Sequence, residues 1–246
     1  MPTFRLSLEY DGREFAGWQI QPAGQRTVQG TLHEAFRRVT GREVRVIGAG
    51  RTDAGVHAEG QVASVAVETE LAPDRLRRAL NGVLPPDLAV WECTLAAEGF
   101  HARYQARSKL YRYRIWNGES RSPLCATRAH HVPSALDLEA MRRAAALLLG
   151  THDFAAFQTA GSAVRSTVRS LERLDVEGEP RGEITLLVEG DGFLRQMVRI
   201  LAGTLIEVGL GRRDAAGLPA VLAARERSRA GCTAPAQALT LVRVTY

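Results

Sequence analysis

The sequence predicts an α+β protein made of two tandem ferredoxin-like units, each with the order β-α-β-β-α-β and a mainly antiparallel sheet. Three observations support this fold class. Both halves open with apolar and polar residues in alternation, which is the period of a half-buried strand. Both of these strands run into a turn pair, Asp11-Gly12 or Asn117-Gly118, and an amphipathic helix follows. The 246 residues, 45% of them hydrophobic, suffice for a core of this size.

The first half, residues 1–107, begins with a strand whose apolar positions run from Phe4 to Tyr10 at every second residue. A helix is expected after Thr27, because a threonine side chain can cap the first turn. Gly41 stands where the glycine that ends a helix belongs. The remaining elements expected in this half are two strands and a helix, at residues 44–47, 61–67 and 74–80.

The second half, residues 108–246, repeats this order. Its first strand has Tyr111, Tyr113 and Ile115 on one face. The next helix is expected to begin at the cap Asp137 and to end at Gly150. The remaining elements expected here are strands at residues 173–177, 184–188 and 239–246 and a helix at residues 193–208. A cleft between two such units is a natural ligand site.

The charge composition gives weak support for nucleic-acid binding. Thirty-two basic and 27 acidic residues leave a net charge of +5, and Lys109 is the only lysine, so the other 31 basic residues are arginine. Arginine suits phosphates and stacks on bases. A coding bias towards arginine explains most of this count without any function.

The three cysteines, Cys93, Cys125 and Cys232, are far apart and odd in number, so neither a disulfide framework nor a zinc site is expected. This composition fits a reducing cytoplasm. The N-terminus alternates and carries charges, unlike a secretory signal. No apolar run approaches the roughly 20 residues that a membrane helix needs.

The segment at residues 48–58 places an acid, a base and a histidine within seven residues, between two expected strands. Its three glycines permit tight turns and the close approach of another chain. They do not fit the dinucleotide fingerprint, and no lysine follows as in a phosphate-binding P-loop. From the residues alone, Asp53 can equally cap a helix or pair with Arg51 at a turn.

The run Gly-Arg-Thr-Asp-Ala-Gly-Val-His-Ala at residues 50–58 resembles the signature of the TruA family of tRNA pseudouridine synthases. Further segments resemble that family's motifs in the same order along nearly the whole chain. These segments are residues 9–12 with Phe15 and 17–19, residues 100–103 and 109–113, residues 153–154 with Phe157, and residues 193–199.

The resemblance implies the pseudouridine synthase fold with its active-site cleft between the two units. It implies an isomerase that converts uridine to pseudouridine at positions 38, 39 and 40 of the tRNA anticodon stem-loop, after the base has flipped out. The reaction is an isomerisation, so we expect no cofactor and no metal. The resemblance also implies tRNA as the partner and a homodimer in the cytoplasm.

The resemblance gives Asp53 the role of nucleophile. Whether its carboxylate attacks C1′ or C6, or removes a proton from C2′, stays open. The resemblance places Tyr111 beneath the target uracil and gives Arg199, on the expected helix at residues 193–208, the task of keeping Asp53 ionised. Arg51 would fill the space of the flipped base or hold a phosphate, with a structural pair to Asp53 as the alternative.

Other polar and aromatic residues of these motifs have weaker assignments. His57 is either a general base or, as we favour because the reaction needs little external proton transfer, a residue that fixes the loop by hydrogen bonds. Trp18 and Gln19 are expected to shape the cleft. Arg195 precedes Arg199 by four residues, so both would share one helical face, where Arg195 is either a surface residue or a phosphate contact. Four further arginines can contact phosphates or simply be scattered surface charge: Arg103, Arg107, Arg112 and Arg114.

Two other classes of protein fit parts of the sequence. A non-catalytic RNA-binding module can present sheets of this kind, although the aromatic signature of such sheets is absent. A hydrolase with an aspartate nucleophile would act on a small glycoside and would need a second carboxylate, for which Glu59 is the nearest in sequence. Replacing Asp53 with asparagine separates a binding module from an enzyme.

Overall fold

The computed structural model describes residues 1–22, 24–159, 161 and 164–246. The chain divides into two compact units. Unit 1 comprises Met1–Arg107 together with Thr240–Tyr246, and unit 2 comprises Ser108–Leu239. Helices and mainly antiparallel strands make up both units, so the α+β class is confirmed. The division differs from the expected one in a single point: the last strand, expected in the second half, groups with the first unit.

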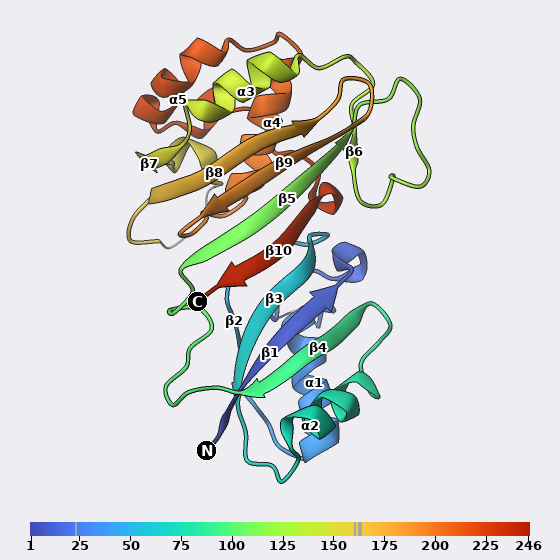
Figure 1. Cartoon of the computed structure of the whole chain (residues 1–246). Coiled ribbons are helices and arrows are strands. Elements are labelled where there is room, and N and C mark those ends of the chain that lie inside the picture. Colours follow the sequence, from blue (N-terminus) through green and yellow to red (C-terminus); the bar gives the residue numbers. More distant parts are fainter. Residues whose placement is uncertain (23, 160, 162–163) are drawn as a thin grey trace. The chain divides into compact units, whose positions relative to one another are not determined.

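The sheet of unit 1 has its strands in the order β4-β1-β3-β10, with β2 also paired to β3. β1 pairs antiparallel with both of its neighbours, whereas β10 runs parallel to β3. The strands are β1 (Thr3–Tyr10), β2 (Val46–Gly48), β3 (His57–Ala66), β4 (Leu88–Leu95) and β10 (Leu239–Thr245). Two helices, α1 (Val28–Thr40) and α2 (Pro73–Asn81), contact β2 and β4 respectively (Figure 1).

The local signals of unit 1 produce these elements as expected. The alternating side chains of β1 from Phe4 to Tyr10 are buried. The Thr27 hydroxyl accepts a hydrogen bond from the backbone N–H of Gly30 at 3.2 Å, which caps α1. Gly41 ends α1 with a φ of 70°, a left-handed conformation that favours glycine. β4 follows α2 and completes the expected order β-α-β-β-α-β, although the sequence pattern indicates no residue range for it.

The sheet of unit 2 has the order β5-β9-β8-β7 with antiparallel pairing, and β6 runs parallel to β5. Its strands are β5 (Ser108–Trp116), β6 (His130–His131), β7 (Gly150–Asp153), β8 (Val168–Gly178) and β9 (Glu183–Gly190). Its helices are α3 (Leu138–Ala146), α4 (Met197–Gly209) and α5 (Leu218–Ala224). α3 packs against both α4 and β8 (Figure 1).

Two expected helix boundaries in unit 2 are wrong. The helix expected at residues 193–208 begins only at Met197, because Gln196 has a left-handed φ of 61° that interrupts a helix. Arg195 therefore lies outside α4 and does not share a helical face with Arg199. The helix after Asp137 ends at Ala146, and Gly150, with a φ of 93°, begins β7 instead of ending the helix.

Within the described ranges, no helix combines the length and the apolar character needed to cross a membrane.

Candidate active site

The loop that carries Asp53 connects β2 to β3 in unit 1 and spans residues 49–56. Asp53 is half-buried, whereas its neighbour Thr52 is buried and Ala54 is exposed. A turn closes directly after the aspartate, where the backbone N–H of Val56 donates to the carbonyl oxygen of Asp53 at 3.2 Å. Asp53 is thus the first residue of a tight turn, and its side chain is only partly covered by protein.

A second segment, residues 11–27 between β1 and α1, holds this loop through its backbone. The N–H of Trp18 donates to the carbonyl oxygen of Thr52 at 3.0 Å, and the N–H of Gly55 donates to that of Phe15 at 3.4 Å. These bonds lie on both sides of Asp53 in the sequence. They fix the backbone that presents its carboxylate.

A buried polar cluster fixes the loop from the side of the sheet. The hydroxyls of Tyr10 and Thr52 form a hydrogen bond of 2.8 Å, and either can be the donor. The side-chain amide of Gln61 donates to the carbonyl oxygen of Gly50 at 2.9 Å and reaches the Tyr10 hydroxyl at 3.5 Å. Burial raises the pKa of Tyr10 to about 12, so its hydroxyl stays protonated. Satisfied buried clusters of this kind hold one geometry.

Two glycines let the two segments approach closely. A Cβ atom at Gly17, which has a φ of 96°, would lie 2.7 Å from the carbonyl oxygen of Thr52. A Cβ atom at Gly12 would lie 2.0 Å from that of Val56. Any side chain there would push the loop away. The segments at residues 9–19 and 50–58 therefore pack directly against each other.

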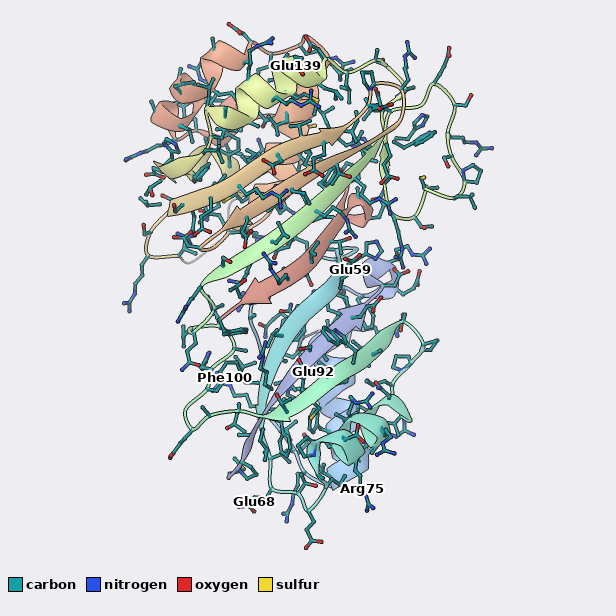
Figure 2. The ribbon with its side chains drawn as sticks, viewed as in Figure 1. Glu59, Glu68, Arg75, Glu92, Phe100 and Glu139 are labelled. Atoms are coloured by element: carbon teal, nitrogen blue, oxygen red, sulfur yellow. The ribbon has the colours of Figure 1, made fainter. Side chains whose placement is uncertain are left out.

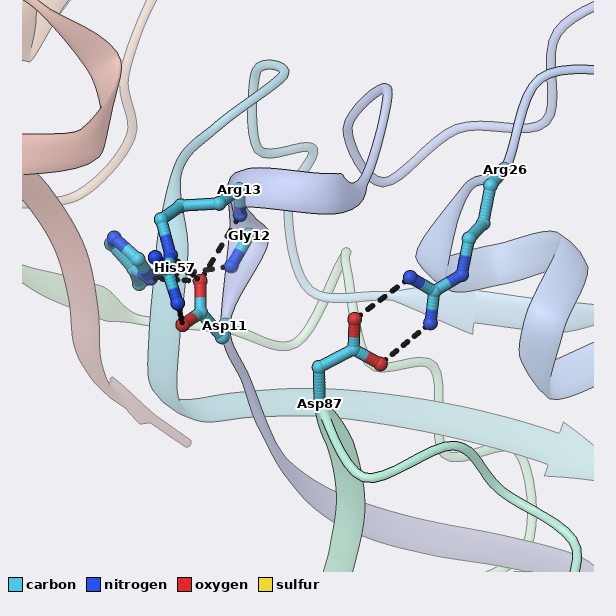
Figure 3. A network of polar contacts seen from close by, with 6 residues as sticks. All are labelled: Asp11, Gly12, Arg13, Arg26, His57 and Asp87. Atoms are coloured by element: carbon cyan, nitrogen blue, oxygen red, sulfur yellow. Dashed lines mark hydrogen bonds and ion pairs between the residues drawn. The ribbon is translucent and has the colours of Figure 1, made fainter. Parts of the chain in front are cut away.

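His57 is buried at the start of β3 and contacts the turn after β1 (Figure 3). The backbone N–H of Gly12 donates to its Nδ1 atom at 3.2 Å, which assigns the proton of the neutral ring to Nε2. Asp11 Oδ1 also lies 3.2 Å from Nδ1 and would accept a hydrogen bond from the protonated ring. These contacts agree with a role for His57 in fixing the loop.

Asp11 joins this turn to its surroundings. Its carboxylate accepts hydrogen bonds from the Arg13 side chain at 3.0 and 2.8 Å, and its backbone N–H donates to the carbonyl oxygen of Asp87. Asp87 in turn pairs with both terminal nitrogens of Arg26 (Figure 3). The hydrogen bond from Arg13 lowers the pKa of Asp11, and the nearby His57 lowers it further when charged.

The other residues of unit 1 singled out in the sequence occupy varied positions. The Arg51 side chain is exposed on the loop, two residues before Asp53. Trp18 is buried, with its ring centre 6.5 Å from that of Tyr10, and Gln19 is exposed. Glu59 is half-buried on β3, two residues after His57 (Figure 2).

Tyr111 lies on β5 in unit 2, opposite Val188 of β9. The tyrosine is buried, at 6% exposure, and its ring meets that of Phe193 in a T-shaped contact with a centroid distance of 5.1 Å. Tyr113, two residues on, is fully buried in the core.

Arg199 lies in the first turn of α4, half-buried. Its Nε atom donates to the carbonyl oxygen of Ala234 at 2.8 Å, and the N–H of Ala234 donates back to the Arg199 carbonyl oxygen at 3.1 Å. This pair of bonds orients the stem of the arginine. Arg195 is exposed in the segment before the helix.

The four arginines considered for phosphate contacts fall into different environments. Arg114 forms a two-pronged ion pair with Glu183, at 2.9 and 2.6 Å, which favours the structural account for this residue. Arg112 is half-buried, whereas Arg103 and Arg107 are exposed. In the part of the chain that the structure describes, no group of three histidine, cysteine, aspartate or glutamate side chains is placed to hold a metal ion.

Sequence reasoning missed Tyr10 and Gln61 as residues that support the loop. In the sequence both look like ordinary strand residues. Tyr10 lies 42 residues before Thr52, which it contacts, and Gln61 lies 11 residues after Gly50, whose carbonyl oxygen it contacts. A buried glutamine is the one local signal, because a buried amide needs hydrogen-bond partners. Only the fold reveals which partners it has.

Comparison with known proteins identifies the family. A family model described as tRNA pseudouridine synthase matches residues 7–105 and 144–246. The tRNA pseudouridine synthase A of Myxococcus xanthus is 48% identical over 246 residues, covering 100% of this chain and 92% of that protein. Proteins of the same name from Acetivibrio thermocellus and Moorella thermoacetica are 45% and 47% identical, with 100% of both chains covered. The chain belongs to the tRNA pseudouridine synthase family.

Proposed function

We propose that this protein is an isomerase that converts uridine to pseudouridine at positions 38, 39 and 40 of the tRNA anticodon stem-loop, with Asp53 as its nucleophile. The observation that carries this proposal is the full-length similarity to tRNA pseudouridine synthases, combined with a half-buried aspartate on a loop held from two sides. The match spans the whole of two relatives, so the substrate class is inferred from complete proteins.

The reaction needs one carboxylate and no oxidant or reductant. The bond between uracil N1 and ribose C1′ breaks, the base turns, and C1′ joins C5. The proton on C5 is lost and N1 gains one, so the atoms of the nucleotide balance. The ionised Asp53 supports the electron-poor sugar carbon or attacks the nucleotide directly, as carboxylates do in glycoside chemistry. We therefore assign neither a cofactor nor a metal to this reaction.

Three further residues bind the substrate in this proposal. Tyr111 stacks on the target uracil, Arg51 holds the phosphate or fills the space that the flipped base leaves, and Arg199 keeps Asp53 ionised. Stacking contributes about 1–3 kcal/mol per base, which offsets part of the cost of flipping. The two bonds between Arg199 and Ala234 support its role, since they fix the stem of the side chain at the start of α4.

Two finer assignments come with the family resemblance. We propose a homodimer, which sedimentation should reveal as a particle of twice the chain mass. We also place the protein in the cytoplasm, where its three unpaired cysteines suit a reducing compartment.

The test uses unmodified tRNA labelled with tritium at uridine C5. Wild type should release tritium and yield pseudouridine at positions 38–40, and Asp53→Ala should do neither. Asp74→Asn, an exposed carboxylate on α2, is the matched control and should react at the wild-type rate. Release of free uracil would identify a glycoside hydrolase instead. Binding of tRNA by wild type without any tritium release would identify a binding module.

A further inference from the structure

The segment between β4 and β5 displays two stacked aromatic rings on the surface of unit 1. The rings of His101 and Tyr104 lie 4.2 Å apart between centroids at an interplanar angle of 25°. Tyr104 is 77% exposed, so this large ring contributes little to the core. Tyr104 is exposed and yet held in place by a stacking partner, which suggests that its ring binds another molecule.

The backbone beneath these rings is anchored to the sheet. Ala102 is fully buried, and its N–H donates to the hydroxyl of Ser64 on β3 at 3.2 Å. The hydroxyl of Tyr246, at the end of the chain, donates to the carbonyl oxygen of Ala102 at 2.7 Å. The ring of Phe100 packs 5.1 Å from that of Tyr246. The segment therefore has a fixed base from which Tyr104 projects.

The imidazole of His101 is also held in place. Its Nδ1 atom accepts hydrogen bonds from the backbone N–H groups of Arg103 and Tyr104, each at 3.2 Å. The backbone N–H of Gln105 donates to the carbonyl oxygen of His101, and the backbone N–H of His101 donates to the side-chain oxygen of Gln105. Ordering these rings in advance lowers the entropy cost of binding a ligand on them.

The charge beside the rings fits a nucleotide. The guanidinium carbon of Arg103 lies 5.9 Å from the centre of the Tyr104 ring, and Arg107 is exposed further along the segment. Proteins bind unpaired RNA bases by stacking them on aromatic side chains, and they hold the adjoining phosphates with basic residues such as arginine. A protein partner would favour a broader apolar patch, and the exposed neighbours Glu98, Arg103 and Gln105 do not provide one.

The position of these rings separates them from the reaction. Ser64, to which the segment is anchored, follows His57 by seven residues on β3. At about 3.3 Å per strand residue, the anchor lies roughly 20 Å from the start of the strand that follows the Asp53 loop. Figure 2 likewise places Phe100 and Glu59 towards opposite ends of the sheet of unit 1. A base stacked on Tyr104 is therefore not the base that Asp53 attacks.

We infer that His101 and Tyr104 form a stacking platform for an unpaired base of the tRNA several nucleotides from the reacting uridine, with Arg103 at the adjoining phosphate. This inference rests on the proposed function only in taking tRNA as the bound RNA. The platform positions the substrate and takes no part in breaking or forming bonds.

The test compares the equilibrium dissociation constant for unmodified tRNA and the steady-state constants of three variants. Tyr104→Ala should raise Kd and KM about tenfold and leave kcat within twofold, since it removes the stacking and leaves the chemistry intact. Tyr104→Phe keeps the ring and should behave as wild type. Trp91→Ala removes another exposed aromatic ring of unit 1, on β4, and should also leave Kd unchanged.

The outcomes separate this inference from the proposed function. Wild-type tritium release together with an unchanged Kd for Tyr104→Ala would overturn the platform alone. A fall in kcat at constant KM would also overturn it. So would a lower molecular mass of Tyr104→Ala in sedimentation, because the ring would then lie between copies of the chain. A wild type that binds tRNA without releasing tritium would overturn the function, while the Kd comparison would still test the platform.

Discussion

Among single residues, Tyr10 is central to the position of the Asp53 loop, because its hydroxyl bonds to the loop from the neighbouring strand β1. It contacts Thr52, the residue directly before Asp53, from a strand 42 positions earlier in the sequence. Gln61 reaches both this hydroxyl and the carbonyl oxygen of Gly50. These side chains thus hold the backbone just before Asp53 without needing to touch the RNA. Misplacing a reacting group by about 1 Å can cost about 100-fold in rate.

Tyr10→Phe should lower kcat about tenfold and leave KM unchanged. The ring and its packing remain, whereas the buried Thr52 hydroxyl and Gln61 amide lose a partner and the loop loses its fixed position. Initial rates at several tRNA concentrations measure both constants. Tyr113→Phe is the matched control, since the buried hydroxyl of Tyr113 has no hydrogen-bond partner among the residues that the structure describes. An unchanged kcat for Tyr10→Phe would show that the cluster does not position Asp53.

Asp11 should contribute to stability in a pH-dependent way. The Arg13 hydrogen bond lowers its pKa in the folded protein, so the folded state favours the ionised carboxylate. This stabilisation is present above the unfolded pKa of about 4 and is lost as pH falls through the folded value. The unfolding temperature of Asp11→Asn should therefore fall less than that of wild type between pH 7 and about pH 3. If the unfolding temperatures of wild type and Asp11→Asn fell by the same amount over this pH range, this role of Asp11 would be contradicted.

Contact between the β1–α1 segment and the Asp53 loop is the decisive feature at the scale of elements. Gly12→Ala should destabilise the protein by about 1–3 kcal/mol and abolish most activity, because the new Cβ would lie 2.0 Å from the Val56 carbonyl oxygen. Denaturant unfolding and tritium release measure the two effects. Gly217→Ala is the control, since no atom lies within 4 Å of a Cβ at that position. Equal stability of both variants would refute the close approach.

The strands and helices with strong local signals were predictable from sequence. The period-two pattern located β1, and the cap Thr27 with Gly41 bounded α1. The start of α4 was not predictable, because its apolar stripe continues back to Leu194 while the conformation of Gln196 breaks the helix. Tertiary structure imposes that conformation, and nothing in the local sequence indicates a left-handed glutamine.

The active-site residues show the same division between local and distant information. Asp53 stands in a motif whose residue types and order could be recognised in the chain. Tyr10 and Gln61 could not be assigned to the loop, since strands that pair across long separations bring them there. The grouping of β10 with unit 1 likewise follows from its parallel pairing with β3, which no sequence period encodes.

At the scale of the whole molecule, the positive charge should make tRNA binding depend strongly on salt. Removing one arginine that neutralises a phosphate should lower the slope of log Kd against log salt by about one. Arg103→Gln should show this change, because its guanidinium is exposed beside Tyr104. Arg114→Gln should keep the wild-type slope, since that side chain is paired with Glu183. Equal slopes for all three proteins would remove Arg103 from the RNA interface.

The most direct test of the central claim is a single-turnover reaction of Asp53→Asn with unmodified tRNA, in parallel with wild type. The variant keeps the shape of the side chain and removes only its negative charge. We predict wild-type affinity for tRNA, no pseudouridine and no tritium release. Pseudouridine formed by Asp53→Asn at the wild-type rate would show that the carboxylate of this loop does not perform the reaction.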